Sequence, residues 1–247
     1  MSKRAEYIWA IVALLITAGV VVVFYARQPP HPRGPQPKRT TGASATKNEP
    51  SGDSTAAALR KAKHSLESLD QAANESDWEG VGNHFSSFQE ATRILPLPEL
   101  RHPDISMALL DFFSLYEVQL ERAIEREEQP TVIYASNQLE GIVDDLIAQL
   151  NPGVPPELGR LRFLSRDISY WAGAGDERML RVRAAGLEKL WSDLRPLIVD
   201  RNGRKAAENF DVLLLQLQSA GGPEDIQTIS PQLQNAVRDL EAILAKR

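Results

Sequence analysis

Histidine is the first residue type in this 247-residue chain whose chemistry has to be considered. The sequence contains four of them, His31, His64, His84 and His102. His102 and Asp104 of the His-Pro-Asp stretch, together with His84, could meet at one end of a helical bundle and bind a divalent metal. The Glu-x-x-His pattern of metal sites in helical bundles is absent, however. We therefore predict no metal ligand and expect the histidines to be polar surface or loop residues.

Tryptophan is the second residue type that could form a site. Three tryptophans follow residue 53, namely Trp78, Trp171 and Trp191. They could line a cleft for a small ligand. Tryptophans on apolar helix faces are more often core residues whose indole N–H finds a hydrogen-bond partner. We predict this second role and assign no cofactor-binding residue.

Charged side chains are concentrated in two places. Six arginines follow one another closely: Arg160, Arg162, Arg166, Arg178, Arg181 and Arg183. They could hold an acidic ligand or lipid headgroups, but we expect them to pair locally with Asp167, Asp176 and Glu177. An acidic set precedes them: Glu117, Glu121, Glu125, Glu127, Glu128, Asp144 and Asp145. It could form a binding face, although runs of like charge are usually a solvated helix surface, which we expect here.

Motifs that assemble a catalytic centre are missing. The chain has no Gly-rich phosphate loop, no Gly-x-Ser-x-Gly elbow and no His-Glu-x-x-His helix. It also has no cysteine, which excludes disulfides, thiolate metal sites and cysteine nucleophiles. No nucleophile, base and orienting group are arranged together, so we predict that the protein is not an enzyme and has no catalytic residues.

The elements that would position these residues follow an apolar segment near the N-terminus. After a tail of residues 1–6, residues 7–26 contain no charged side chain. Twenty helical residues span about 30 Å, the thickness of a bilayer core. Tyr7, Trp9 and Tyr25 lie where aromatic rings favour the interface. A cleaved secretory signal is the alternative, but its apolar part would be shorter and would end in a small-x-small site. We predict a single transmembrane helix over residues 7–26.

Residues 27–53 are predicted to be a disordered tether. The segment is rich in proline, with Pro29, Pro30, Pro32, Pro35 and Pro37. Such composition favours an extended spacer between the bilayer and a folded domain. A short basic tail before one span is typical of an anchor in the inner (cytoplasmic) membrane that carries an extracytoplasmic, periplasmic domain. The basic residues after the span oppose this orientation under the positive-inside rule: Arg27, Arg33, Lys38 and Arg39.

Apolar spacing of three and four residues predicts eight helices after the tether and no strand. We expect a first four-helix unit over residues 54–152 and a second over residues 153–247. The first helix would bury Leu59, Ala62, Leu66, Leu69 and Ala73, and the third Ile105, Leu109, Phe112, Tyr116, Leu120 and Ala123. Ser76 and Glu79 have the spacing of a capping box for the second helix. Ser230 is the predicted cap of the last helix, with Pro231 in its first turn.

The two units resemble copies of each other. Asp77 lies 99 residues before Asp176, and Phe113 lies 97 before Phe210. Pro96-Leu97 lies 100 residues before Pro196-Leu197, and Gln138-Leu139 lies 94 before Gln232-Leu233. The charges have diverged, because residues 55–152 carry a net charge of −10 and residues 153–247 a net charge of +1. This acidic domain argues against a nucleic-acid partner.

Together, these patterns favour a membrane-anchored, non-catalytic helical module that acts as a scaffold or binds another protein of the cell envelope. Its expected contacts are the lipid bilayer, through residues 7–26, and an envelope protein. An extracytoplasmic domain that senses a small ligand is the alternative, and a metal-handling bundle is a lesser one. The sequence does not predict an oligomeric state.

Overall fold

The computed structural model of the chain describes residues 52–93, 95, 107–150 and 156–245. Within these ranges the protein forms eight α-helices and no strand, which confirms the all-α prediction. Residues 7–26 and the tether up to residue 51 lie outside the described residues. Gly52 and Asp53, which we assigned to the tether, belong to the first described helix. Among the helices described, none has the length and hydropathy needed to cross a membrane.

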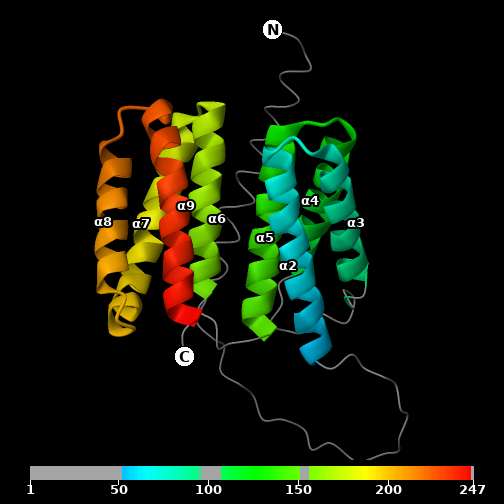
Figure 1. Ribbon diagram of the computed structural model, residues 1–247, viewed down its shortest axis with the longest axis horizontal. Helices are drawn as coiled ribbons and strands as arrows, with labels where there is room; N and C mark the ends of the chain where they lie inside the picture. The colour runs from blue at the N-terminus through cyan, green and yellow to red at the C-terminus, as the bar shows by residue number, and fades with distance from the viewer. Residues whose placement is uncertain (1–51, 94, 96–106, 151–155, 246–247) are drawn as a thin grey trace, which may run out of the picture. The chain divides into compact units, whose positions relative to one another are not determined.

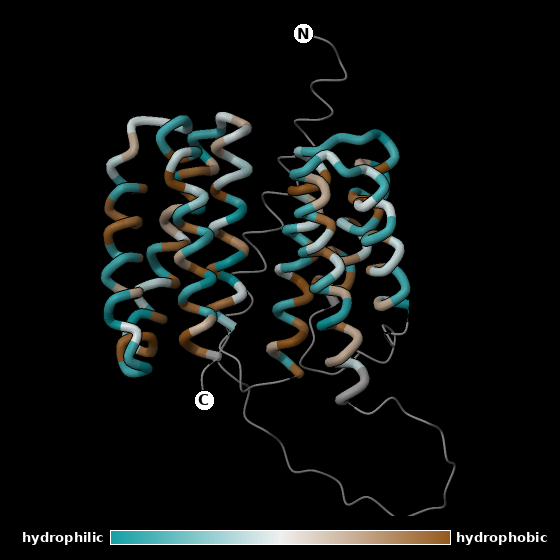
Figure 2. The backbone as a smooth tube through the Cα atoms, in the orientation of Figure 1, coloured by the Kyte–Doolittle hydropathy of each residue, from teal (hydrophilic) through white to brown (hydrophobic). Residues whose placement is uncertain are grey.

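The first four helices pack together (Figure 1). They are α2 (Gly52–Asn74), α3 (Trp78–Arg93), α4 (Met107–Glu125) and α5 (Gln129–Leu150). Helix α2 lies between α3 and α5, and α4 packs against α5. The predicted seam of α2 is confirmed, since its members are buried: Leu59, Ala62, Leu66, Leu69 and Ala73. Figure 2 shows apolar and hydrophilic residues alternating along these helices with the period of an amphipathic surface.

The predicted phase of α4 was wrong by one residue at its first aromatic pair. Phe113 is 1% exposed and belongs to the core, whereas Phe112 is only partly buried. Of the other predicted residues, Leu109, Tyr116, Leu120 and Ala123 are buried as expected, and Ile105 lies outside the described residues. Phe112 and Phe113 both stand three or four residues from Leu109 and Tyr116, so helical spacing allows either of them in the same stripe. The neighbouring helices bury Phe113.

The cap of α3 also differs from the prediction. Asp77, not Ser76, accepts a hydrogen bond from the backbone N–H of Gly80, at 3.0 Å. Ser76 has a φ of 58°, so it occupies the left-handed position that ends α2. The Asp77 N–H donates to the Ala72 carbonyl across that turn. One residue therefore closes α2 and the next residue opens α3.

The other four helices form a second group: α6 (Pro156–Ala174), α7 (Glu177–Asp200), α8 (Arg204–Ser219) and α9 (Pro223–Ala245). Helix α6 lies between α7 and α9, and α8 packs against α9. Two apolar clusters result, one in each group. Helix α5 of the first group packs against α6 of the second. All eight helices belong to one compact unit, Pro50–Arg247.

The start of α9 was predicted wrongly. The helix begins at Pro223, and Pro231 lies inside it. Ser230 does not cap the helix; its hydroxyl is buried and donates to the Ile226 carbonyl, at 2.7 Å. Pro223 suits a first turn because the missing N–H would have had no helical partner there. Tertiary packing then carries the helix through Pro231 despite the lost backbone hydrogen bond.

Candidate functional site

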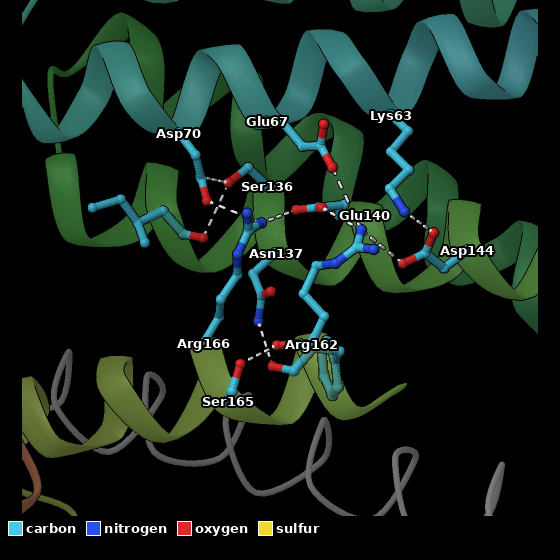
Figure 3. Close-up of polar contacts among 12 residues, drawn as sticks. Lys63, Glu67, Asp70, Ser136, Asn137, Glu140, Asp144, Arg162, Ser165 and Arg166 are labelled. Atoms are coloured by element: carbon cyan, nitrogen blue, oxygen red, sulfur yellow. Dashed lines mark hydrogen bonds and ion pairs between the residues drawn. The ribbon is translucent and has the colours of Figure 1, made fainter. Parts of the chain in front are cut away.

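The charged side chains that could do chemistry meet where α6 packs against α5 and α2. Arg162 and Arg166 lie one turn apart on α6, so both project from the same face. Nη1 of Arg166 pairs with Oε2 of Glu140 on α5 and lies 3.4 Å from Oδ2 of Asp70 on α2. Figure 3 shows this guanidinium between the two carboxyl groups. One cation therefore bridges three helices.

Arg162 bridges four helices. Its Nη1 lies 3.4 Å from Oε1 of Glu140, 3.5 Å from Oδ2 of Asp144 and 3.4 Å from Oε1 of Glu67. Its Nε donates to Oε1 of Glu241 on α9, at 2.6 Å. A planar guanidinium has five N–H donors in a fixed fork, which suits contact with several carboxylates at once. The side chain is 17% exposed, so these ion pairs are partly shielded from solvent.

Two further groups complete this set, which we call the ion-pair network. Nζ of Lys63 lies 2.5 Å from Oδ1 of Asp144, and the Ser136 hydroxyl donates to Oδ1 of Asp70 (Figure 3). The ion-pair network comprises Lys63, Glu67, Asp70, Ser136, Glu140, Asp144, Arg162, Arg166 and Glu241. It holds five carboxyl groups but only three cations, so the cations could not balance all five carboxyl groups if every one were ionised.

Two acids of the ion-pair network, Glu140 and Asp70, have raised pKa values, mainly because they are buried. Burial raises the pKa of Glu140 to about 7, although the Arg166 guanidinium opposes the shift and the Asp70 charge adds to it. Burial likewise raises the pKa of Asp70 to about 6, against the effects of Arg166 and Ser136. Two acids that interact this closely titrate as a coupled pair. The protonation of this pair therefore changes with pH close to neutrality, although both side chains are buried between helices.

The pKa values of the two arginines are also raised, but here the neighbouring carboxylates are the cause and burial opposes them. Burial disfavours the charge of Arg162, but the carboxylates of Asp144, Glu241 and Glu140 outweigh it and raise the pKa of the guanidinium. Burial opposes the charge of Arg166 in the same way, and Glu140 and Asp70 outweigh it. Both arginines thus stay charged while the acids around them titrate.

Two glycines let α5 and α6 approach closely enough for these contacts. A Cβ on Gly159 would lie 2.9 Å from the Cβ and Oδ2 of Asp144. A Cβ on Gly141 would lie 3.0 Å from Cδ2 of Phe163. The Asn137 side chain also reaches across the contact and donates to the Phe163 carbonyl, at 3.3 Å. The closeness of the two helices is therefore built into the sequence at both partners.

A third buried acid, Asp167, lies next to Arg166 on α6. Its Oδ1 accepts from Nε2 of Gln138 at 3.2 Å, and its Oδ2 accepts from Nε1 of Trp171 at 3.2 Å. Nε of Arg183 on α7 lies 2.5 Å from Oδ2, but its N–H is not aligned for a hydrogen bond, so the contact is an ion pair. Burial raises the pKa of Asp167, and Arg183 opposes the shift.

An aromatic cluster adjoins Asp167. Tyr134 of α5 lies against Tyr170 and Trp171 of α6, with ring centroids 4.6 Å and 5.8 Å apart. Tyr116 of α4 meets Tyr134 edge-on, with centroids 6.3 Å apart. Burial raises the pKa of Tyr134, so its hydroxyl stays protonated. These rings extend the contact between α5 and α6 by apolar packing.

The tryptophans pack against the apolar clusters, as predicted, and two of them donate their indole N–H to an aspartate. Trp171 donates to Asp167 as described, and Nε1 of Trp191 donates to Oδ1 of Asp211 at 2.8 Å. Arg195 also binds Asp211, and its hydrogen bond is the main cause of the lowered pKa of that acid. Trp78 packs, partly buried, against the first apolar cluster. All three are packing residues in this structure.

The arginines were expected to pair with Asp167, Asp176 and Glu177, and this was right for two of them. Arg181 pairs with Glu177, one turn away on α7, and Arg183 pairs with Asp167. Arg162 and Arg166 instead bind acids 18 to 96 residues away in sequence. Asp176 caps α7 by accepting from the Met179 N–H at 3.0 Å. A helix that repeats cations at i and i+4, as α6 does, favours pairing with another helix over pairing with itself.

The acidic set of the sequence analysis also divides into residues that pair with α6 and residues that are exposed to solvent. Asp144 and Asp145, which we grouped with the glutamates of residues 117–128, contact α6 instead. Arg160 pairs with Asp145, with 3.3 Å between Nε and Oδ1. Glu121, Glu125, Glu127 and Glu128 are exposed, as expected of a solvated surface.

The histidines do not come together in the described part of the chain. His64 is exposed and His84 is half-buried, while His31 and His102 lie outside the described residues. Within the described residues, no group of three or more histidine or acidic side chains is arranged to hold a metal ion.

Of the five acids that bind Arg162 and Arg166, the sequence analysis named only Asp144. Glu140 stands in the apolar run of α5, and Glu67 and Asp70 lie next to the buried seam of α2. Acids at i, i+4 on α5 and cations at i, i+4 on α6 form complementary patterns, which was the available signal.

We compared the chain with protein-family models, with curated proteins and with solved structures, and none of the three comparisons produced a match.

Proposed function

We propose that this protein is a membrane-anchored, non-catalytic helical module that presents a rigid surface to another protein of the cell envelope. The observation that carries the proposal is the use made of the charged residues between α5 and α6. Glu140 of α5 forms ion pairs with Arg162 and Arg166 of α6, and its side chain is only 3% exposed. Such a network joins two helical groups, which is what a scaffold requires.

We infer that the two groups arose by duplication. Five buried residues of α2 each have a buried counterpart on α6 that lies 99 residues later in the sequence. The α2 positions are 59, 62, 66, 69 and 73, and the α6 positions are 158, 161, 165, 168 and 172. Helix order within each group is the same, since α2 and α6 each pack between the second and fourth helices of their own group.

The turn between the first two helices of each group adds independent support. Ser76 and Gly175 both have a positive φ, of 58° and 70°. The next residue in each case is an aspartate that caps the following helix. In both turns this aspartate also donates its N–H to a carbonyl five residues earlier. Random similarity between amphipathic helices does not require matching turn geometry.

A long-range hydrogen bond is repeated as well. Nε2 of Gln129 on α5 donates to the Ala73 carbonyl at 2.6 Å, and Nε2 of Gln227 on α9 donates to the Ala172 carbonyl at 3.2 Å. Gln129 and Gln227 are 98 residues apart. The buried residues of α5 and α9 keep the 94-residue interval of Gln138-Leu139, since Leu139, Val143 and Leu146 correspond to Leu233, Val237 and Leu240. Pro196 lies inside α7, so it is not the helix breaker that the sequence comparison assumed.

The membrane anchor rests on the sequence alone. An uncharged run over residues 7–26 and a proline-rich tether suit a single-pass protein of the inner membrane whose helical domain is periplasmic. The bilayer and one envelope protein are then its partners, and no nucleic acid is expected for a domain with a charge of −9 over residues 55–247.

The test is photocrosslinking of the full chain in cells. A photoreactive amino acid is placed singly at exposed positions of α3 and α7, for example at Asn83, Glu90 and Glu188. We expect one envelope protein to be captured from neighbouring positions of one surface and not from the opposite surface. Native mass spectrometry of the same protein tests the alternative roles, because it detects a small molecule or metal ion that stays bound. A retained small molecule or metal ion, without a confined crosslink, would replace the scaffold by a ligand-sensing or metal-handling role.

A further inference from the structure

Helices α4 and α8 each expose an aliphatic pair on the side that faces away from their own core. Leu115 and Val118 on α4 are each 44% exposed. Val212 and Leu215 on α8 are 50% and 64% exposed. Isolated apolar residues on a surface are ordinary, but two adjacent ones on each of two helices need an explanation.

The two pairs occupy equivalent positions. Leu115 and Val212 are 97 residues apart, and so are Val118 and Leu215. The same interval separates the buried residues Phe113 and Phe210, which fixes the phase of the two helices. An exposed acid stands four residues before each pair, Asp111 on α4 and Glu208 on α8. Residues at i, i+4 and i+7 form one line along a helix, so each helix presents an acid followed by two aliphatic side chains.

We propose that α4 of one copy of this chain docks antiparallel on α8 of a second copy. With Leu115 opposite Leu215, the antiparallel register places Val118 opposite Val212. Two apolar pairs are then removed from water at the centre of the contact. The proposal does not depend on the scaffold role, since it concerns contacts between copies of this chain alone.

Charges on either side of the apolar pairs agree with this register. Arg122 falls opposite Glu208, and Glu125 falls opposite Lys205. All four side chains are exposed and therefore available to a second copy. Opposite charges placed around an apolar centre select the register and the partner.

A contact of α4 with α4 is less favourable. Antiparallel packing of α4 on itself would place Asp111 opposite Arg122, but it would also bring two acidic groups together. Residues 55–152 carry a net charge of −10, whereas residues 153–247 carry +1. Like-charged surfaces repel one another, so the α4 surface prefers the α8 surface.

The contact is heterologous, because α4 and α8 are different surfaces of one chain. Each copy can then bind one neighbour through α4 and another through α8, which extends into a row or closes into a ring. One helix pair buries less than the roughly 1,200–2,000 Å² of a stable complex. We therefore expect weak association of free copies and stronger association wherever copies are held on one surface.

The test uses the absence of cysteine from the chain. Full-length Leu115→Cys and Leu215→Cys variants, carrying different tags and purified in detergent, are mixed and oxidised. We expect the mixed disulfide to form several-fold more than when Leu215→Cys is mixed with Ser192→Cys, an exposed control on α7. A mixed yield no higher than that control would overturn the proposal. So would an equal yield of Leu115→Cys homodimer, which would indicate packing of α4 on α4.

Charge reversal tests the register. Arg122→Glu in the Leu115→Cys chain should lower the mixed yield roughly five-fold, because a favourable pair becomes a repulsive one. Adding Glu208→Arg to the Leu215→Cys chain should restore the yield. No effect of either change would show that the predicted register is wrong. Circular dichroism checks that these exposed changes leave the helices intact.

Discussion

At the residue scale, Glu140 is the acid of the ion-pair network that is best shielded from solvent. It contacts both Arg162 and Arg166, yet its pKa is raised and not lowered. Burial penalises its charge more than the two guanidinium groups compensate for it, since they are shared with Asp70, Asp144, Glu67 and Glu241. A buried ion pair of this kind holds its helices in register without adding much to stability at neutral pH.

The first prediction concerns the pH dependence of Glu140. Its folded pKa of about 7 lies above the usual 4.5, so the folded protein binds this proton more tightly than the unfolded chain does. The contribution to the free energy of unfolding is fully present below pH 4.5 and is lost as the pH rises through 7. Glu140→Gln keeps the neutral form at every pH. We expect the stability of this variant relative to the wild type to increase by about 2–3 kcal/mol between pH 5 and pH 8.

Urea denaturation at each pH measures this difference. Glu90→Gln, an exposed glutamate on α3, is the matched control and should show no such trend. A difference between Glu140→Gln and the wild type that stays constant or shrinks with rising pH would mean that Glu140 is ionised throughout.

The second prediction is that Arg166 is required for stability. Arg166→Met keeps the volume but leaves Glu140 and Asp70 without their shared cation. Removal of one partner of a buried ion pair typically costs about 3–5 kcal/mol. We expect this loss at pH 8 and a smaller loss at pH 5, where protonation neutralises both acids. Arg181→Met removes an exposed pair on α7 and should leave the denaturation midpoint unchanged. Equal effects of the two changes would contradict this account.

At the element scale, α5 and α6 depend on two glycines for their close contact. A methyl group on Gly159 meets the Cβ of Asp144, which cannot move without displacing the α5 backbone. Helix interiors normally favour alanine over glycine by roughly 0.5–1 kcal/mol. The third prediction follows from these opposing effects. Gly159→Ala should destabilise the protein by about 1–3 kcal/mol through overpacking.

The control for this change is Gly82 on α3, where a Cβ would meet nothing within 4 Å. Gly82→Ala should raise the thermal midpoint, because only the gain in helix propensity remains. Stabilisation by both alanines would show that α5 and α6 are further apart than the structure has them.

The fourth prediction concerns the phase of α4. Phe113 is surrounded by core residues and contacts Phe88, with ring centroids 5.8 Å apart. Phe113→Ala should cost about 3–5 kcal/mol in the free energy of unfolding. Phe112→Ala removes a partly buried ring of the same size and should cost clearly less. The reverse order would support the phase that the sequence first indicated. Both variants can be measured by urea denaturation.

At the scale of the whole molecule, the fifth prediction concerns membrane orientation. We expect protease added to intact spheroplasts to digest the chain after about Arg27, since a short N-terminal tail is easily retained while a long domain is exported. A cytoplasmic marker protein should remain intact in the same sample. Protection of the chain until detergent is added would place the helical domain in the cytoplasm, as the basic residues after the span would favour.

The sequence by itself determined the helical class and most of the core. Apolar spacing of three and four residues is a local property of an α-helix, so the stripe of α2 from Leu59 to Ala73 could be predicted without knowing what covers it. The repeated aspartates at positions 77 and 176 pointed to equivalent turns, because backbone conformation depends on neighbouring residues.

Only the tertiary structure decided how the charged residues are used. The acids that bind Arg162 come from three other helices, and no local rule of helix geometry names a partner on another helix. The same limit explains the α4 error, since Phe112 and Phe113 are equally apolar and only the neighbouring helices distinguish them. Burial of Glu140 and its raised pKa also arise from packing, because desolvation depends on every atom that surrounds the carboxyl group.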